Sequence, residues 1–479
     1  MSNRIAPPLL RPCRLSLRAF ALLLIPVLLA CASLQTHAQA LPTDTLDSSR
    51  AIARAVPPWL STAIVYEIFP RDFSAEGTLN GVTAKMGTLE QLGFNVLWIM
   101  PIQPIGVERR LGPLGSPYSI RDYYAIDPAL GTKADFLRLV QAAHQHHMRV
   151  ILDMVADHTS RDSVMMTHPQ FYQHDAAGNA VAPHGWSDVA ALNYDNPELR
   201  KYMLAMFAYW LKDFDLDGFR CDAAGFVPTS FWNQVREEVQ GIRPDALLLA
   251  EASKPELMRH DFDLDYAWPL LATFDRVIEH GEPASAIREE IAKQAAKFPS
   301  GTQHMLISDD HDEQRATVRY GAAGAIAASA LVFTLPGVPM LYNGMEVGDA
   351  TPSSGPALFE KRPLYWGAAH ERPDFPEFYR VMIPLRKSSP ALRGGDLVWL
   401  HNSDEAHVLT YLRRSPEETE LVAANLSNAR FRGTAEIPGQ GWQEVALNAK
   451  AKPGVVALPF LSLDPFQVRV FRLLTPHAQ

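Results

Sequence analysis

Short apolar runs alternate along most of this chain with segments in which apolar residues recur at three- and four-residue spacing. The first pattern predicts buried β-strands, and the second predicts amphipathic helices, for example at 133–147 and 198–214. The predicted strands are 64–69, 96–100, 150–154, 218–221, 247–250, 263–267, 304–307 and 338–342. Eight strands separated by helices fit a closed barrel, although an open doubly wound sheet would show the same alternation.

Two long segments depart from this alternation. After the third predicted strand, residues 159–196 are rich in His, Asp, Gly and Pro and show little periodicity, so we interpret them as an inserted loop subdomain. From residue 394 onward, short alternating runs are separated by Gly, Pro and Asn, which is typical of antiparallel strands. The sequence therefore predicts an α/β barrel domain at 59–393 and a C-terminal β domain at 394–479.

The N-terminal segment has the composition of an export signal. Four arginines precede an apolar run at 19–30, and the small residues at 38–40 suit signal peptidase. We therefore predict a signal peptide at 1–40 and a polar linker at 41–58, and we expect the protein in the periplasm or outside the cell. The apolar run is shorter than the roughly 20 residues that a membrane-spanning helix needs, so no membrane span is predicted.

The same leader allows a second interpretation. Residues 28–31 (LLAC) resemble a bacterial lipobox, in which Cys31 would be lipidated and would anchor the protein to a membrane surface. Cys13 also lies in the leader, which leaves Cys221 alone in the folded part of the chain and predicts no internal disulfide. The two interpretations differ in whether the mature chain begins at Cys31 or after Ala40.

Composition narrows the classes of partner. The net charge of −9 is not accompanied by a basic block, so neither nucleic acid nor an anionic lipid surface is an expected electrostatic partner. With 47% hydrophobic and 20% charged residues, the chain has the composition of a globular protein with a large core. A neutral substrate fits this balance best.

Acidic residues follow four of the predicted strands. The segments are DMVADH (153–158), GFRCDAA (218–224), LLLAEAS (247–253) and ISDDHDEQR (307–315). A single acidic residue after a strand is usually a helix N-cap. Four such segments in order indicate catalytic groups, because the active site of a (β/α)8 barrel lies at the carboxyl ends of its strands. This observation favours the barrel over the open sheet.

In order and spacing, these segments resemble the conserved regions of the α-amylase family of glycoside hydrolases. The resemblance includes SPYSIRDYY (116–124) and PGVPMLYNGME (336–346) and covers nearly the whole chain after the leader. It implies a (β/α)8 TIM barrel with a short insertion after strand 3 and a C-terminal antiparallel β-sandwich domain. It also implies retaining hydrolysis of α-1,4-glucosidic bonds in starch, glycogen or maltodextrins.

A retaining glycosidase needs one carboxylate that attacks the anomeric carbon and one carboxyl that protonates the leaving oxygen. The resemblance assigns these roles to Asp222 and Glu251, respectively, and makes Asp312 the third carboxylate, which supports the transition state. Arg220 lies two residues before Asp222 on a strand, so alternation places both side chains on one face. Its guanidinium can keep the nucleophile ionised or pair with Asp153, and both can hold together.

Three further residues match family positions that bind the reacting glucose. His158 and His311 correspond to histidines that hydrogen-bond its hydroxyls, and Tyr118 corresponds to the aromatic platform beneath it. A lone histidine is usually structural or metal-bound, and a lone tyrosine usually only packs. Two histidines at corresponding strand ends favour contact with sugar.

The sequence departs from the family at three places. Asp157 and Asp310 stand where the family has Asn, and Gly225-Phe226 replaces a Lys-His pair. The family's calcium site uses the position of Asp157 and the backbone of the missing His, so the resemblance leaves calcium open and implies no other cofactor. Phe226 can offer a stacking surface to sugars on the leaving-group side. An acidic Asp310 predicts no chloride dependence and is a candidate for raising the pKa of the acid/base.

Other functions remain compatible with parts of this pattern. A transglycosylase or an exo-acting α-glucosidase would use the same covalent intermediate on the same scaffold. A non-catalytic glucan-binding surface protein is a different class, and the intact acidic triad argues against it. A metal enzyme with His158 and His311 as ligands is disfavoured, because Arg220 beside the cation would repel it.

Overall fold

The structure is a computed structural model that describes residues 50–447 and 458–474. The predicted signal peptide, with Cys31, and the predicted linker up to residue 49 lie outside the described residues. All described residues belong to one compact unit, which spans residues 47–479. Within the described part of the chain, no helix is both long and apolar enough to cross a membrane.

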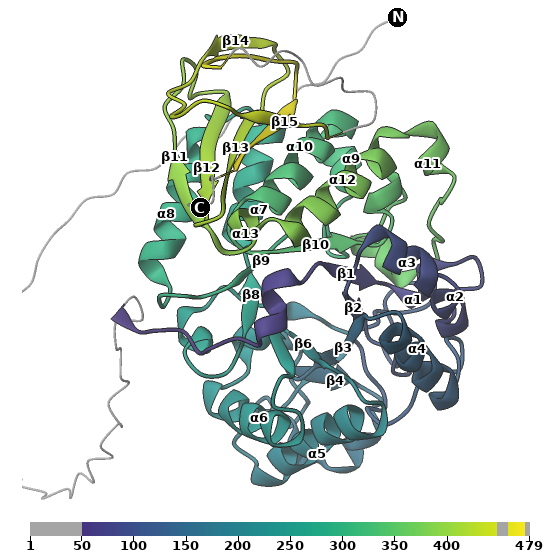
Figure 1. Cartoon of the computed structure of the whole chain (residues 1–479). Coiled ribbons are helices and arrows are strands. Elements are labelled where there is room, and N and C mark those ends of the chain that lie inside the picture. Colours follow the sequence, from purple (N-terminus) through teal and green to yellow (C-terminus); the bar gives the residue numbers. More distant parts are fainter. Residues whose placement is uncertain (1–49, 448–457, 475–479) are drawn as a thin grey trace, which may run out of the picture. The chain divides into compact units, whose positions relative to one another are not determined.

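Eight parallel strands form a closed barrel in the order β1-β10-β9-β8-β7-β6-β3-β2 (Figure 1). Every strand end lies within one residue of its predicted position, and the predicted barrel is confirmed. The strands are β1 Val65–Ile68, β2 Val96–Ile99, β3 Arg149–Val155, β6 Gly218–Asp222, β7 Leu247–Ala250, β8 Leu264–Tyr266, β9 His304–Leu306 and β10 Val338–Tyr342. Alternate residues fill the barrel interior, among them Trp98, Leu249 and Met340, while the other face packs on the helices.

Helices surround the barrel and form most of its outer layer. They are α1 Pro70–Phe73, α2 Leu79–Thr83, α3 Met86–Leu92, α4 Lys133–Gln145, α5 Pro197–Asp213, α6 Thr229–Ile242, α7 Trp268–Phe274, α8 Ser285–Lys297, α9 Ala316–Arg319, α10 Gly321–Thr334, α11 Ala368–Glu371, α12 Asp374–Ser388 and α13 Pro390–Gly394. Local chemistry fixes several of their ends. The side chain of Asn196, for example, caps α5 by accepting hydrogen bonds from the backbone N–H groups of Glu198 and Leu199.

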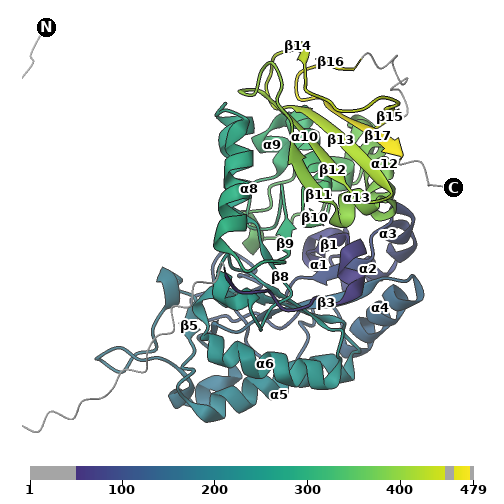
Figure 2. The same cartoon turned by 60° about the vertical axis from the view of Figure 1, so that its left-hand side comes forward.

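The segment predicted as an inserted subdomain joins β3 to α5. It contains β4 His158–Ser160 and β5 Val189–Ala191, which pair antiparallel in a small sheet of their own. Three short 3₁₀ turns lie between these strands, at Val164–Thr167, Pro169–Phe171 and Pro183–Gly185. Because its elements are this short, the segment shows no periodicity in sequence. Figure 2 shows β5 well away from the C-terminal strands.

The C-terminal domain consists of two antiparallel sheets, as the sandwich prediction requires. The larger sheet has the order β11-β12-β13-β17-β15, and β14 pairs with β16. The strands are β11 Asp396–Trp399, β12 Val408–Arg414, β13 Glu418–Asn425, β14 Phe431–Thr434, β15 Gln443–Val445, β16 Phe460–Leu463 and β17 Val468–Leu474. One face of the larger sheet, with Leu412 and Phe471, packs with Phe431 and Leu463 of the smaller sheet. The opposite face belongs to the main core, next to α10 and α12 (Figure 2).

Candidate active site

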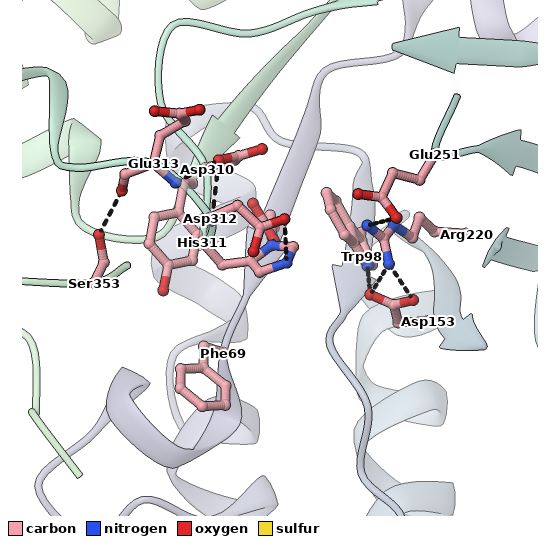
Figure 3. A network of polar contacts seen from close by, with 12 residues as sticks. Phe69, Trp98, Asp153, Arg220, Glu251, Asp310, His311, Asp312, Glu313 and Ser353 are labelled. Carbon is pink, nitrogen blue, oxygen red and sulfur yellow. Dashed lines mark hydrogen bonds and ion pairs between the residues drawn. The ribbon is translucent and has the colours of Figure 1, made fainter. Parts of the chain in front are cut away.

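Arg220, in the middle of β6, contacts three acidic side chains at the carboxyl ends of neighbouring strands. Its Nη1 donates to both carboxylate oxygens of Asp153, at 2.9 and 3.1 Å, and to Oδ1 of Asp222 at 2.9 Å. Its Nη2 lies 3.0 Å from Oε2 of Glu251. Figure 3 shows Arg220 between Glu251 and Asp153. The structure therefore brings Asp222 and Glu251 to one guanidinium. Arg220 pairs with both Asp222 and Asp153, the two partners considered from the sequence.

Aromatic rings enclose the guanidinium on several sides. The Cζ atom of Arg220 lies 5.1 Å from the ring centroid of Trp98, 5.5 Å from that of Tyr118 and 5.8 Å from that of Tyr266. Burial alone would lower the pKa of Arg220, but Asp153 and the other neighbouring acids raise it well above its ordinary value. Arg220 therefore stays charged although it is fully buried.

Glu251 has the environment of a general acid. Burial raises the pKa of its carboxyl to about 8, and the negative charges of Asp222 and Asp312 add to this effect against the opposing charge of Arg220. Its Oε2 also accepts a hydrogen bond of 2.7 Å from the backbone N–H of Ala223. Ala223 has a left-handed backbone with φ of 47°, so the chain turns sharply after Asp222 and aims this N–H at Glu251.

His311 occupies the opposite side of the site and links several groups (Figure 3). Its Nδ1 lies 2.5 Å from Oε1 of Glu67, and its Nε2 lies 2.8 Å from the hydroxyl of Tyr118 and 3.4 Å from Oδ2 of Asp312. Burial alone would lower the pKa of His311, but Asp312 and Glu67 raise it to about 10. The ring is therefore an imidazolium at neutral pH, held between two carboxylates.

Asp310, the second departure from the family pattern, is fully buried beside this group. Its Oδ1 accepts hydrogen bonds from the backbone N–H groups of Asp312 and Glu313, at 3.1 and 3.0 Å. Burial raises the pKa of Asp310 well above its ordinary value, which favours the neutral acid. The charges of Asp222 and Asp312 raise the pKa of Glu251, and a contribution of Asp310 to this pKa stays a prediction.

A cavity of about 210 Å³ opens over these groups. Of the predicted site residues, Tyr118, His158, Asp222, Glu251 and Asp312 line it, while Arg220 and His311 lie buried behind them. The remaining lining residues are Leu111, Ser116, Trp186, Asp188, Val189, Leu358 and Phe359. A small cavity with convergent carboxyls and rings is suited to a sugar, which presents both hydroxyls and apolar ring faces.

Two contacts at this site were not predicted from sequence. Glu67 binds His311 from β1, and its only sequence signal is that it is the one charged residue in the apolar run 64–69. Trp186 of the inserted segment lines the cavity and packs edge-on against His158, with ring centroids 5.3 Å apart. Because the inserted segment shows no periodicity, the aromatic side chain of Trp186 was the only sequence signal for its place at the cavity.

Comparison with known proteins agrees with this geometry. The model of the alpha-amylase catalytic domain matches residues 67–181 and 183–372. The chain belongs to the alpha-amylase family. An alpha-amylase of Haloarcula japonica is 29% identical over 415 residues, which are 80% of this chain and 59% of that protein. The chain therefore spans less than two thirds of that relative.

Two other family members are matched over a larger share of their own length. A cyclomaltodextrinase of a Bacillus species is 27% identical over 429 residues, which are 78% of this chain and 74% of that protein. The solved structure of a maltogenic alpha-amylase from Thermotoga neapolitana has a TM-score of 0.76 and 28% identity. It matches 87% of this chain and 97% of its own. The likeness thus includes both the barrel and the C-terminal domain.

The position of the alpha-amylase calcium site is built differently in this family member. Oδ2 of Asp157 lies 3.3 Å from Nδ1 of His158 and 3.2 Å from Nε2 of His184. The backbone oxygen of Gly225 accepts a hydrogen bond from the ammonium group of Lys254. Calcium needs six or more oxygen ligands, and here imidazoles and an ammonium group approach the oxygens instead. These residues do not fit calcium, and the described residues include no cluster of three His, Cys, Asp or Glu that could hold a metal.

Proposed function

We propose that this protein is a retaining glycoside hydrolase that cleaves α-1,4-glucosidic bonds of starch, glycogen or maltodextrins. The observation that carries the proposal is the pair of Asp222 and Glu251 on the guanidinium of Arg220, with different environments at the floor of one cavity. Glu251 keeps its proton near neutral pH, and Arg220 donates a hydrogen bond to Asp222. Two carboxyl groups with separated tasks are what double displacement at an anomeric carbon requires.

In the first step, Glu251 donates its proton to the glycosidic oxygen while an oxygen of Asp222 attacks the anomeric carbon. The bond from that carbon to the leaving sugar breaks, and a glycosyl ester of Asp222 forms. In the second step, the ionised Glu251 takes a proton from water, whose oxygen attacks the same carbon and releases Asp222. Each step inverts the anomeric carbon, so the product keeps the α-configuration.

We assign the remaining predicted residues to the sugar that reacts. Asp312 lies at the cavity surface and is suited to bind hydroxyls as the ring flattens toward an oxocarbenium ion. His158 and Tyr118 line the same cavity and offer a hydrogen-bonding ring and an aromatic face. The charged His311 is bound to Tyr118 and Asp312, so it fixes both side chains while lying behind them.

The proposal is tested with the purified full chain on maltoheptaose, soluble starch and a cyclomaltodextrin. We expect shorter maltooligosaccharides whose first-formed anomer, followed by NMR, is α. Asp222→Asn should lose at least about a thousandfold in kcat, and Asp195→Asn, an exposed carboxylate of the insertion, should lose nothing. A β-anomer as first product, or turnover by Asp222→Asn equal to wild type, would overturn the proposal. The relative rates on the three substrates report endo, exo and ring-opening action.

We also propose that the chain is exported, on the strength of its cationic, apolar and small-residue leader. The protein would act on glucans in the periplasm or outside the cell, either free or anchored through a lipid on Cys31. Intact mass of the mature protein decides between the two, because cleavage after Ala40 and lipidation at Cys31 give different masses. A mature protein that retains residues 1–30 would contradict both.

A further inference from the structure

Two loops meet beside the catalytic cavity and form one of its walls. Leu111, in the loop that follows β2, and Leu358 and Phe359, in the loop that follows β10, line the cavity with apolar side chains. The backbone N–H of Leu114 donates to the backbone oxygen of Phe359 at 2.9 Å, so the two loops are joined to each other. The joined segments are called the loop bridge and comprise residues 111–115 and 358–359.

Arg71 fastens the loop bridge to the barrel. It is the second residue of α1, which follows β1, and its side chain is buried. Its Nη1 donates to the backbone oxygens of Gly115 and Leu358, each at 3.2 Å, and so binds both loops. The loops are also closely packed, because a Cβ at Gly112 would lie 2.7 Å from the Cβ of Phe359. The bridge is therefore a hydrogen-bonded, well-packed part of the cavity wall.

The strand order places the loop bridge across the mouth of the barrel from Glu251. In the closed barrel β1 stands between β10 and β2, and β7 is the strand farthest from β1 around the ring. Arg71 and the two bridge loops follow β1, β2 and β10, whereas Glu251 directly follows β7. Under the proposed mechanism the leaving sugar departs on the side of Glu251. The sugars on the other side of the cleaved bond, toward the non-reducing end, therefore point at the bridge.

The cavity has little room beyond the reacting sugar. Its volume of about 210 Å³ is below the range of roughly 300–1,000 Å³ that is usual for pockets that bind larger ligands. Ser116, next to the bridge, also lines the cavity, and its Oγ accepts the N–H of Tyr118 at 3.2 Å. The hydroxyl hydrogen of Ser116 can thus be donated to a hydroxyl of a terminal sugar, whereas a continuing chain meets apolar side chains.

We propose that the loop bridge restricts the enzyme to the non-reducing ends of α-glucans, with a single sugar on that side of the cleaved bond. The proposal rests on the proposed function and names its substrate class, which is linear chains with a free non-reducing end. An internal bond of a long chain, or any bond of a cyclic glucan, would place a further sugar where the bridge stands. The first product from each chain is then one glucose.

The experiment uses maltoheptaitol, whose reduced end identifies the bond that is cut, with and without a 4,6-O-ethylidene group on its non-reducing sugar. The full chain should release glucose and maltohexaitol first from the unblocked substrate. Its kcat/KM for the blocked substrate should be at least about 100-fold lower, because the added group meets the bridge. Equal rates on both, or maltopentaitol among the first products, would overturn the bridge and leave the proposed function intact. A protein that cleaves neither maltoheptaitol nor soluble starch would overturn both.

The double variant Leu111→Ala/Phe359→Ala removes two side chains of the wall and keeps the backbone hydrogen bond between the loops. Its kcat/KM for the blocked substrate should rise at least about 10-fold, and maltopentaitol should appear among the first products, because a second sugar then fits. Phe359→Ala alone should change the products in the same direction. A double variant that is active on the unblocked substrate but keeps the wild-type products would overturn the role of the bridge.

Val107→Ala is the matched control for these variants. Val107 lies in the same loop as Leu111, is 58% exposed and lines no part of the cavity. Alanine there should leave the first products and the ratio of the two kcat/KM values as in the wild-type protein. If Val107→Ala changed the products as much as the double variant does, the effect would come from the loop in general and the bridge would be overturned.

Discussion

Arg220 contacts two carboxyl groups of one site. Asp222 receives a direct hydrogen bond of 2.9 Å from its Nη1. Glu251 lies 3.0 Å from Nη2, yet burial and two neighbouring negative charges still raise its pKa to about 8. Arg220 and Asp153 are fully buried and hydrogen-bonded to each other, and this pairing holds the guanidinium beside both carboxyls. The different contacts of the proposed nucleophile and the proposed acid are therefore built into the fold before substrate binds.

A pH profile follows from the protonation of Glu251. Its carboxyl carries a proton below a pH of about 8 and loses it above, and the proposed mechanism needs this proton, so kcat/KM should decline as pH rises through about 8. Asp310→Asn should leave this alkaline limb in place, because burial raises the pKa of Asp310 and favours its neutral form, which adds no negative charge beside Glu251. Initial rates on maltoheptaose at several pH values measure the alkaline limb of the wild-type protein and that of Asp310→Asn. A limb that moves to lower pH in Asp310→Asn would restore the role first predicted for that residue.

Glu67 acts on the site through His311, which it holds at 2.5 Å. The charge of Glu67 is among those that raise the pKa of His311 to about 10. Glu67→Gln should therefore lower the pKa of His311, read from its ring resonances by NMR. It should also reduce kcat/KM about 10-fold, because the ring that orients Tyr118 and Asp312 loses a charged partner.

The control for Glu67 is Glu90→Gln, which alters a similar pair on the surface. Glu90 lies 2.8 Å from Nδ1 of His146, and the side chains of His146 and Glu90 are 36% and 43% exposed, respectively. Solvent screens this pair, so its loss should leave kcat/KM unchanged. If Glu67→Gln has normal kcat/KM and an unaltered His311 pKa, Glu67 only fills space in β1.

At the level of elements, sequence patterns predict the strands well because each barrel strand is buried on both faces and reads as an apolar run. The acidic residues at strand ends could be placed for the same reason, since position along a strand fixes which end of the barrel they reach. Glu67 could not be assigned from sequence, because its partner His311 lies 244 positions away. The ring of His184 was missed as well, since its place depends on a left-handed turn within an aperiodic insertion.

The contact between β6 and β7 provides a prediction about the strands that position Asp222 and Glu251. Gly218 starts β6 with φ of +146°, and a Cβ there would lie 2.1 Å from the backbone oxygen of Leu247. Gly218→Ala should therefore push the two strands apart and lower the free energy of unfolding by about 3 kcal/mol or more. It should also reduce activity, because Asp222 and Glu251 lie at the far ends of these strands.

Gly241→Ala is the matched control for Gly218→Ala. Gly241 lies near the end of α6, and no heavy atom stands within 4 Å of the position its Cβ would take. Alanine there should leave stability unchanged or raise it by up to about 1 kcal/mol. Thermal melts and activity assays of the two variants, made side by side, separate a backbone clash from the general cost of replacing glycine. Equal melting points would contradict the clash.

At the scale of the whole molecule, α10 lies between the barrel and the C-terminal domain. The helix is apolar around most of its circumference, with Leu331 and Phe333 buried, because one side faces the barrel and the other faces the larger sheet. Arg413 of β12 donates to the backbone oxygen of Thr334 at its end. The C-terminal domain therefore contributes to the covering of a barrel helix, and its proposed role is to stabilise the catalytic domain.

Tyr411 tests this role, because it joins β12 to α10 without touching the active site. Its hydroxyl lies 2.6 Å from Oγ1 of Thr334, and that Oγ1 itself donates to the backbone oxygen of Ala330. Tyr411 is thus the donor, and Tyr411→Phe leaves a buried acceptor with one partner fewer. The free energy of unfolding should fall by about 1 kcal/mol, and Tyr411→Ala should cost about 3–5 kcal/mol because a cavity is added.

Neither substitution of Tyr411 should change kcat/KM below the melting transition, since no residue that lines the cavity belongs to β12 or α10. Tyr365→Phe is the control, because the Tyr365 hydroxyl binds Glu371 at 2.6 Å on an exposed surface, where its loss should change stability by less than about 0.5 kcal/mol. Thermal unfolding followed by circular dichroism, with activity measured on the same samples, compares the three variants. If Tyr411→Phe has the same melting temperature as Tyr365→Phe, the hydrogen bond between the domains contributes nothing to stability. If activity is lost before the fold in Tyr411→Ala, the C-terminal domain shapes the site as well as supporting it.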